Sequence, residues 1–388
     1  MKAANRIAKI PPYLFAEIDK KMAEAVARGV DIISLGIGDP DRPTPGHIIE
    51  ALNREARVAD NHRYPAYEGS ARFREAVATY YRGRFGVELD PDREVMALIG
   101  SKEGLAHIIW AFVDPGDYAL IPDPAYPVYK THTLLAGGIP YLMPLRKENG
   151  FLPDFDAVPK DVIARAKIVF LNYPNNPTAA VADLDFFQKA VDFCREHRLL
   201  LCHDNAYAEM TYDGYVAPSV LEVPGAKEVA VEFYSLSKPF NMTGWRIGAA
   251  VGNAEAVEAL GIIKTNTDSG QFTAIQHAGV EALENNPKAF FEEMNLVYAR
   301  RRDIAVEGLS SVGLEVEKPR GTFYLWVPVP RLYSAAEFTA LLLDQAGVVV
   351  APGTGYGEYG EGYIRIALTV EEDRLKEAMD RIARQVKL

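Results

Sequence analysis

The 388-residue sequence predicts an α/β protein with a mostly parallel sheet, followed by a smaller α+β region. Short apolar runs alternate with amphipathic helical stretches, a pattern typical of a parallel sheet covered on both faces. Each run ends abruptly in polar residues, and near residue 286 the alternation gives way to one long polar helix and further short strands. The strands predicted in the first region are residues 94–100, 117–122, 166–172, 198–204 and 229–237.

The change of pattern predicts two domains and an N-terminal segment. We expect a large α/β domain over residues 46–285 and a small α+β domain over residues 286–388. Residues 1–45 are expected to pack on the small domain. The helices predicted between the strands are residues 103–112, 128–137 and 184–197, and the small domain is expected to hold a helix over residues 287–309 and strands near residues 323–329, 347–353 and 363–369.

Composition excludes several classes of function. Acidic residues outnumber basic ones, 53 to 42, and no block of lysine and arginine stands out, which argues against a nucleic-acid binder. The two cysteines, Cys194 and Cys202, lack the spacing of metal ligands, so we expect no metal site and a reducing compartment. No apolar run is long enough to span a membrane, and the N-terminus lacks a signal-peptide core. We therefore expect a soluble, cytoplasmic protein.

Lys238 is the most informative residue. It follows the apolar run that ends "FYSLS", and a proline comes directly after it. Such a lysine is ordinarily a surface residue whose stem packs while its amine reaches water. Here Ser235 and Arg246 accompany it, which suggests an anion bound beside the amine. An amine near other cations and partly shielded from water has a lowered pKa and reacts with carbonyl groups. The pattern favours a Schiff-base lysine next to a phosphate.

Asp204 and Tyr207, in "CHDNAY", follow another predicted strand. An aspartate at a strand end is commonly a helix cap. In the same pocket as Lys238, its carboxylate would instead pair with a protonated pyridine nitrogen, the arrangement that sustains pyridoxal phosphate (PLP) chemistry. Tyr207 would then donate to the phenolic oxygen of the ring. Ligands bind at the carboxyl ends of the strands in such sheets, so these groups are expected to converge.

Four further segments fit one pocket, although each has an ordinary structural explanation. Asn176 in "NYPNNPTA" is either part of a turn or a second donor to the phenolic oxygen. The glycine turn before Ser101 and Lys102 opens a helix whose N-terminus suits a phosphate. Tyr126 is either a core residue or a cover for a flat ring. Arg365, inside the apolar run "YIRIAL", needs an anionic partner such as a substrate carboxylate.

The order of these motifs along the whole chain resembles the class I/II aminotransferases, which have fold type I of the PLP enzymes. The resemblance implies a mostly parallel seven-stranded sheet in the large domain. It also implies that Lys238 binds the cofactor covalently and moves the substrate proton, with Asp204 on the pyridine nitrogen and Arg365 on the α-carboxylate. The other implied cofactor contacts are Asn176 and Tyr207 at the phenolic oxygen, Tyr126 over the ring, and Ser101, Lys102, Ser235 and Arg246 at the phosphate.

The resemblance further implies ping-pong transfer of an amino group between an amino acid and 2-oxoglutarate. It implies a homodimer that shares its active sites, in which Tyr64 of "YPAYEG" reaches the phosphate of the neighbouring subunit. Two positions depart from the family pattern, Ala179 where glycine is common and Phe73 where leucine is common. Neither has a chemical role, so they bear on the subfamily rather than on the reaction.

The segments "PPYLFAEI", "LGIGDP", "GSKEG" and "DPAYPVY" are similar to those of LL-diaminopimelate aminotransferases, enzymes of lysine biosynthesis. That similarity implies that Tyr13 reaches the pocket from the partner subunit and that Gly38 lines it. Glu68 is either a solvated residue or the partner of the substrate's distal ammonium group. Lys102 would serve the distal carboxylate or the phosphate, and Asn176 would also contact substrate.

Three alternatives remain open. A broad aspartate/alanine-type aminotransferase is the main one, although no additional arginine for a side-chain carboxylate is evident. A PLP-dependent β-lyase would share Lys238, Asp204 and Arg365. A PLP-binding regulator is the third, but such proteins carry an N-terminal DNA-binding domain, and 45 residues leave no room for one.

Overall fold

The computed structural model describes residues 3–10, 14–285 and 287–386. Its main feature is a seven-stranded sheet in the order β2-β8-β7-β6-β5-β3-β4. Adjacent strands are parallel except that β8 is antiparallel to both β7 and β2. This confirms the predicted fold class. The strands are β2 (Val95–Leu98), β3 (Tyr118–Asp123), β4 (Ile139–Pro144), β5 (Ala166–Leu171), β6 (Leu200–Asn205), β7 (Ala230–Ser235) and β8 (Gly248–Gly252).

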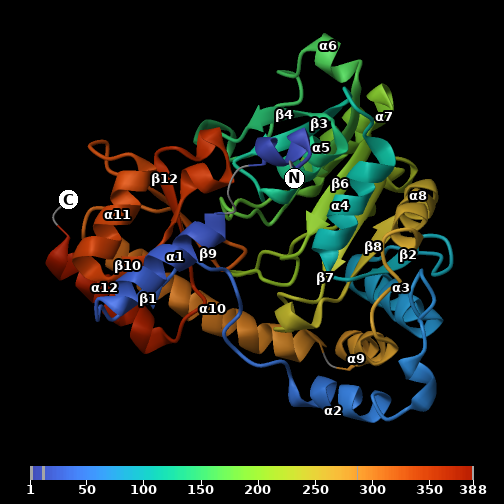
Figure 1. Cartoon of the computed structure of the whole chain (residues 1–388), viewed down its shortest axis with the longest axis horizontal. Coiled ribbons are helices and arrows are strands. Elements are labelled where there is room, and N and C mark those ends of the chain that lie inside the picture. The colour runs from blue at the N-terminus through green and yellow to red at the C-terminus, as the bar shows by residue number, and fades with distance from the viewer. Residues whose placement is uncertain (1–2, 11–13, 286, 387–388) are drawn as a thin grey trace.

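Helices cover both faces of this sheet (Figure 1). Successive residues of a strand point to opposite faces, so Leu201 joins one apolar core while Cys202 joins the other. The first core lies under α3, α7 and α9, and the second lies under α4, α5 and α8. The helices in this part of the chain are α2 (Gly46–Glu55), α3 (Ala71–Phe85), α4 (Ser101–Phe112), α5 (Val128–Ala136), α6 (Lys160–Ile163), α7 (Leu184–His197), α8 (Ala254–Thr265) and α9 (Thr273–Glu284).

Helix α7 illustrates why these segments are helical. The Asp183 side chain accepts a hydrogen bond from the Phe186 backbone N–H at 2.9 Å, which satisfies one of the free amides at the helix start. Phe187, Ala190 and Cys194 recur at helical spacing and are buried against the sheet. The helix therefore begins at a cap and is held by one apolar face.

The C-terminal region forms a second body around its own core. Its sheet has the order β11-β12-β9 with antiparallel neighbours, and residues 33–34 of the N-terminal segment pair with residues 348–349 in a separate two-stranded sheet. The strands are β1 (Ile33–Ser34), β9 (Tyr324–Pro328), β10 (Val348–Val349), β11 (Ala351–Pro352) and β12 (Tyr363–Ala367), and the helices are α1 (Leu14–Ala27), α10 (Pro287–Ser310), α11 (Ala335–Ala346) and α12 (Glu372–Gln385). The domain boundaries at residues 45 and 285 stay predictions.

The N-terminal segment is tied to this second body. Buried Arg301 of α10 donates from both terminal nitrogens to the two carboxylate oxygens of Asp41, at 2.7 and 2.8 Å. A bidentate pair of this kind fixes both distance and orientation. The segment that follows β1 is thereby held beside the C-terminal region, where it faces the edge of the large sheet. No helix among the described residues has the length and apolar character needed to cross a membrane.

Candidate active site

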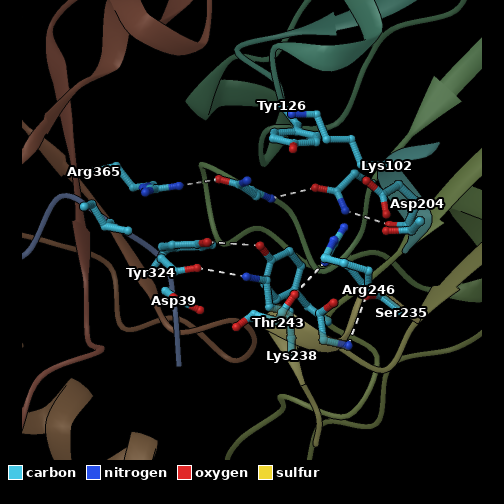
Figure 2. A pocket seen from close by; sticks show the side chains of 18 residues that line it. Asp39, Lys102, Tyr126, Asp204, Ser235, Lys238, Thr243, Arg246, Tyr324 and Arg365 are labelled. Atoms are coloured by element: carbon cyan, nitrogen blue, oxygen red, sulfur yellow. Dashed lines mark hydrogen bonds between the residues drawn. The ribbon is translucent and has the colours of Figure 1, made fainter. Parts of the chain in front are cut away.

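A cavity of about 420 Å³ lies at the carboxyl ends of the parallel strands. Asp204 from β6 and Ser235 from β7 form one wall, and Tyr324 from β9 and Arg365 from β12 form the other (Figure 2). The switch in strand direction does not disturb this edge, because β2 and β7 are both antiparallel to β8 and hence parallel to each other. Polar groups from both bodies of the protein therefore converge on one space.

Lys238 extends into the cavity just after β7. Its Nζ donates to the carbonyl oxygen of Gly38 at 2.9 Å. Burial lowers the pKa of the Lys238 amine to about 8, with the nearby Asp39 carboxylate opposing the effect and the Arg365 cation adding to it. A lysine amine is nucleophilic only when it is unprotonated, so near neutral pH the reactive form of Lys238 is a minority, but a far larger one than for an ordinary lysine.

Asp204 has two carboxylate oxygens in different surroundings. Tyr129 of α5 donates its hydroxyl hydrogen to Oδ2 at 2.7 Å, whereas Oδ1 is buried and has no hydrogen-bond partner among the described residues. Burial raises the pKa of Asp204 to about 6, and the Tyr129 hydrogen bond opposes that rise. A buried oxygen without a partner is costly, which indicates a position for a donor from a bound molecule.

Tyr324 contacts both Tyr207 and Arg365, and Arg365 in turn donates to Asn176. The Tyr207 and Tyr324 hydroxyls lie 3.0 Å apart, and burial raises the pKa of Tyr207 well above its usual range, so its hydroxyl keeps its proton. Arg365 donates from Nη1 to Asn176 Oδ1 at 2.9 Å and from Nη2 to the Gly36 carbonyl at 2.8 Å. Because the Asn176 oxygen is engaged by Arg365, its amide N–H₂ is the group left to donate toward a ligand.

The start of α4 and the loop after β7 form an anion-binding corner. Gly100 has φ +71°, and a Cβ there would lie 2.3 Å from Arg246 Nη2, so only glycine allows the arginine to sit against the helix start. Arg246 Nη1 donates to the Thr243 carbonyl at 2.7 Å. Ser101, Lys102 and Ser235 line the same cavity. Free amides at a helix N-terminus together with cationic and hydroxyl side chains suit a phosphate.

Glu103, in the first turn of α4, fixes the preceding glycine turn through two contacts on the side facing α8. The Ile99 backbone N–H donates to Glu103 Oε2 at 3.0 Å, and the buried Lys264 amine lies 3.5 Å from the same oxygen. Lys264 also donates to Asp268 Oδ1 at 2.9 Å. The glycine turn is thus fixed between the sheet and α8.

Tyr126 lines the cavity after β3, and its ring meets the ring of Tyr129 edge to face, with centroids 6.0 Å apart. Tyr129 in turn stacks on Phe170 with an interplanar angle of 11°. Tyr126 therefore lines the pocket and also contacts the core through Tyr129. A role as a cover for a flat ring stays a prediction.

Two of the predicted site residues that the structure describes are not brought into this cavity. Tyr64 is 87% exposed and Glu68 is also exposed, and neither lines the cavity of its own chain. Tyr13 lies outside the described residues. Gly38, in contrast, is in the cavity wall, and its contact with substrate stays a prediction.

Sequence reasoning missed Tyr324, Thr243 and Asp39 as pocket residues, missed Tyr129 as the donor to Asp204, and gave no role to Asn172. Asn172 donates to the Asp204 carbonyl at 2.6 Å and accepts from the Asn176 backbone N–H at 2.7 Å, so it links two predicted site residues. Its position just after a buried strand was a usable signal. Tyr129 and Tyr324 gave none, because an aromatic residue in an apolar run looks like core.

Comparison with known proteins identifies a family. Residues 30–382 match the family "Aminotransferase class I and II". An LL-diaminopimelate aminotransferase of Moorella thermoacetica is 60% identical over 99% of this chain and 98% of that protein. An LL-diaminopimelate aminotransferase of Trichormus variabilis is 56% identical over 98% of each. A single mutant of Thermus thermophilus aspartate aminotransferase superposes with a TM-score of 0.93, at 31% identity over 99% of each chain.

Proposed function

The chain belongs to the class I and II aminotransferases, and on this premise we propose that it transfers the amino group of LL-diaminopimelate to 2-oxoglutarate, using PLP. The family is PLP-dependent. The observation that most strongly supports LL-diaminopimelate as the amino donor is the 60% identity, over nearly the whole of both chains, to an LL-diaminopimelate aminotransferase. The neighbour with aspartate aminotransferase activity in its name shares only 31%.

The residues present fit PLP. Oδ1 of Asp204, which has no hydrogen-bond partner in the described part of the chain, would accept from the pyridinium nitrogen, and this would stabilise the buried carboxylate as an anion. Asn176 and Tyr207 would donate to the phenolic oxygen, and Tyr126 would cover the ring. Ser101, Lys102, Ser235 and Arg246 would hold the phosphate. When bound, PLP supplies an aldehyde that bonds to amino groups and a protonated ring that accepts the electron pair left by the departing α-proton.

The chain's own groups account for the remaining steps. Arg365 binds the α-carboxylate of the amino acid, since its planar fork matches two carboxylate oxygens. Lys238 would hold the cofactor through its Nζ, and the same Nζ, when free and unprotonated, would take up the α-proton of the bound amino acid. The same Nζ would then release that proton, so Lys238 would act first as a base and then as an acid. A lowered pKa suits this work because the group must both accept and release a proton near neutral pH.

We also propose that two copies share their active sites. Tyr64 is 87% exposed and lies outside the pocket of its own chain, which suits a side chain that reaches the phosphate of a second copy. Glu68, four residues later and exposed, would approach the same pocket and pair with the distal ammonium of diaminopimelate. The predicted cytoplasmic location and the predicted contribution of Tyr13 stay predictions.

The test is a donor panel with 2-oxoglutarate. LL-diaminopimelate, aspartate, alanine and aromatic amino acids are supplied in turn, and glutamate formation is measured. We expect selective turnover of LL-diaminopimelate. Broad turnover of small amino acids would favour the aspartate/alanine alternative, and pyruvate with ammonia but no glutamate would indicate a β-lyase.

The role of Glu68 is tested by Glu68→Gln in the same assay. The change should raise KM for LL-diaminopimelate and leave KM for 2-oxoglutarate unchanged, because only the donor carries a distal ammonium group. Glu75→Gln, at an exposed position of α3, is the matched control and should behave as wild type. Equal donor KM values in all three proteins would contradict the assignment.

A further inference from the structure

Tyr324 contacts three parts of the candidate site at once, although the mechanism above gives it no role. It is buried in β9 with 2% of its surface exposed. Its hydroxyl lies 3.0 Å from the Tyr207 hydroxyl, and the Arg365 guanidinium carbon lies 4.1 Å from its ring centroid. Figure 2 shows Tyr324 between the Arg365 side and the Lys238 side of the cavity.

The third contact is with Gly38. A Cβ at position 38 would lie 2.0 Å from the Tyr324 hydroxyl oxygen, so the tyrosine occupies the space that any side chain there would need. The Gly38 carbonyl is also the acceptor for Lys238 Nζ at 2.9 Å. Tyr324 and the glycine backbone are therefore packed together immediately beside the reactive amine.

We propose that Tyr324 is a positioning residue that directs the Tyr207 hydroxyl hydrogen into the cavity and holds the plane of the Arg365 guanidinium. This inference rests on the proposed function, because it concerns how Tyr207 meets the cofactor and how Arg365 meets the substrate. It assigns a role for the reaction to a residue whose sequence position looks like ordinary core.

The first half of the proposal follows from counting hydrogens. A tyrosine hydroxyl has one hydrogen and two acceptor lone pairs. When Tyr324 donates to the Tyr207 oxygen, the Tyr207 hydrogen stays available for a phenolic oxygen in the cavity. In the opposite arrangement, Tyr207 would donate its only hydroxyl hydrogen to Tyr324 and would have none left for a ligand. Tyr207 acts as a cofactor donor only in the first arrangement.

The second half follows from the geometry around Arg365. Its two terminal nitrogens are oriented by Asn176 and by the Gly36 carbonyl, and the face of the guanidinium rests on the Tyr324 ring. A cation over an aromatic face is attracted by the ring, more strongly where water is excluded. The Tyr356 ring also contacts the guanidinium, at 4.8 Å, but Tyr324 is nearer and is the ring that also contacts Tyr207. The Tyr324 ring thus helps to restrict Arg365 to a plane in which its fork is presented to the cavity.

Tyr324→Phe separates the two halves, because it removes the hydroxyl and keeps the ring. The readout is the pKa at which the visible absorption band of the PLP-loaded protein changes. A donor to the phenolic oxygen disfavours protonation at the cofactor, so weakening the Tyr207 donor should raise that pKa by about half a unit to one unit. The charged and titratable groups that face Tyr207 are Tyr324, Arg365 and Asp204, and the variant alters only the first.

A double-mutant cycle shows whether Tyr324 acts through Tyr207. In a Tyr207→Phe background there is no hydroxyl to direct, so adding Tyr324→Phe should leave the band pKa unchanged. Tyr234→Phe is the matched control, because the Tyr234 hydroxyl donates to Tyr80 at 3.1 Å in another buried tyrosine pair, away from the cavity. It should titrate as wild type.

Tyr324→Leu tests the ring. Relative to Tyr324→Phe, we expect KM for the amino donor to rise about three- to thirtyfold with a smaller change in kcat, because Arg365 loses the nearer of the two aromatic rings, Tyr324 and Tyr356, that it contacts. Equal KM values in the two variants would overturn this half of the proposal. Tyr324→Met also lacks an aromatic face, so it provides the same comparison if the leucine variant does not fold.

Failure of this inference differs from failure of the proposed function. A wild-type protein that has a visible band and transfers amino groups, with Tyr324→Phe titrating identically, overturns the role of Tyr324 alone. So does a Tyr324→Phe shift that persists in full in the Tyr207→Phe background. A wild-type protein with no visible band in the presence of PLP overturns the proposed function and this inference with it.

Discussion

At the scale of single residues, the two oxygens of Asp204 have different hydrogen-bond partners and therefore different roles. Oδ2 is held by the Tyr129 hydroxyl, and Oδ1 is left for a donor from the cofactor. Tyr129 is a neutral donor, so it orients the carboxylate without cancelling its charge. The anion therefore stays available to stabilise a protonated pyridine nitrogen.

Tyr129→Phe should lower kcat/KM about ten- to a hundredfold, the range expected from losing a hydrogen bond to a charged group. The loss follows because the hydrogen bond lowers the pKa of Asp204, and without it the carboxylate is a poorer anion. Steady-state kinetics with the preferred donor measures the effect. Tyr173→Phe is the control, because it removes an equally buried hydroxyl that donates to the Phe151 carbonyl. Similar rates in both variants would contradict the role given to Tyr129.

The sequence predicted the residues whose chemistry is out of place in a core. Lys238, Asp204 and Arg365 are charged groups in or next to apolar strands, so the residue types alone indicate that each needs a partner. Tyr129 and Tyr324 could not be predicted, because their rings satisfy the core pattern and only the direction of the hydroxyl reveals the function. Their roles depend on three-dimensional placement rather than on composition.

At the scale of elements, the turn between β2 and α4 is the most constrained connection at the site. It brings a helix N-terminus, Ser101 and Lys102 to the same corner as Arg246. Gly100 permits this approach, since its φ is positive and Arg246 fills the space a side chain would need. The geometry of one glycine thus controls how the phosphate corner is assembled.

Gly100→Ala should weaken binding of PLP at least about tenfold, because the added Cβ displaces the Arg246 guanidinium and the left-handed backbone is strained. Equilibrium titration of the cofactor-free protein measures the effect. Gly83→Ala is the control, since Gly83 lies inside α3, where an added Cβ would meet open space, and alanine favours a helix. Unchanged PLP affinity in Gly100→Ala would contradict this account of the turn.

Several elements could be predicted and others could not. The strands β2, β3, β5, β6 and β7 are continuous apolar runs, which is why the sequence predicts them. Strand β8, "GAAVG", consists of small residues, and its antiparallel direction follows from tertiary pairing with β7 and β2. Strand β4 carries two prolines on an edge of the sheet, where proline is tolerated but weakens the strand signal.

At the scale of the whole molecule, the pocket needs both bodies of the protein. Asp204 and Lys238 come from the large sheet, while Arg365 comes from β12 and Gly38 from the segment anchored by the Arg301–Asp41 pair. This arrangement could not be derived from periodicity, because it depends on how the bodies pack. The roles proposed for the exposed residues Tyr64 and Glu68 depend in turn on packing between two chains.

The site also carries a cost in stability. The pKa of Asp204 is about 6 in the folded protein and about 3.9 in the unfolded chain. Below about pH 3.9 the carboxyl group is protonated in both states and does not oppose folding. As pH rises from about 3.9 through about 6, the buried carboxyl group must ionise, and the free energy of unfolding falls. Asparagine carries no charge, so cofactor-free Asp204→Asn should exceed wild type in stability by about 3 kcal/mol above pH 6 and by little below pH 4. Denaturant unfolding across this range measures the difference, and a difference independent of pH would contradict the assignment.

The central claim is that Lys238 forms the covalent bond to PLP, and borohydride reduction followed by peptide mapping tests it most directly. Reduction converts the bond into a stable amine, so the account predicts one pyridoxyl adduct, on the peptide that contains Lys238. In Lys238→Ala the adduct should be absent. An adduct on another lysine, or none in a protein that binds PLP, would contradict the account.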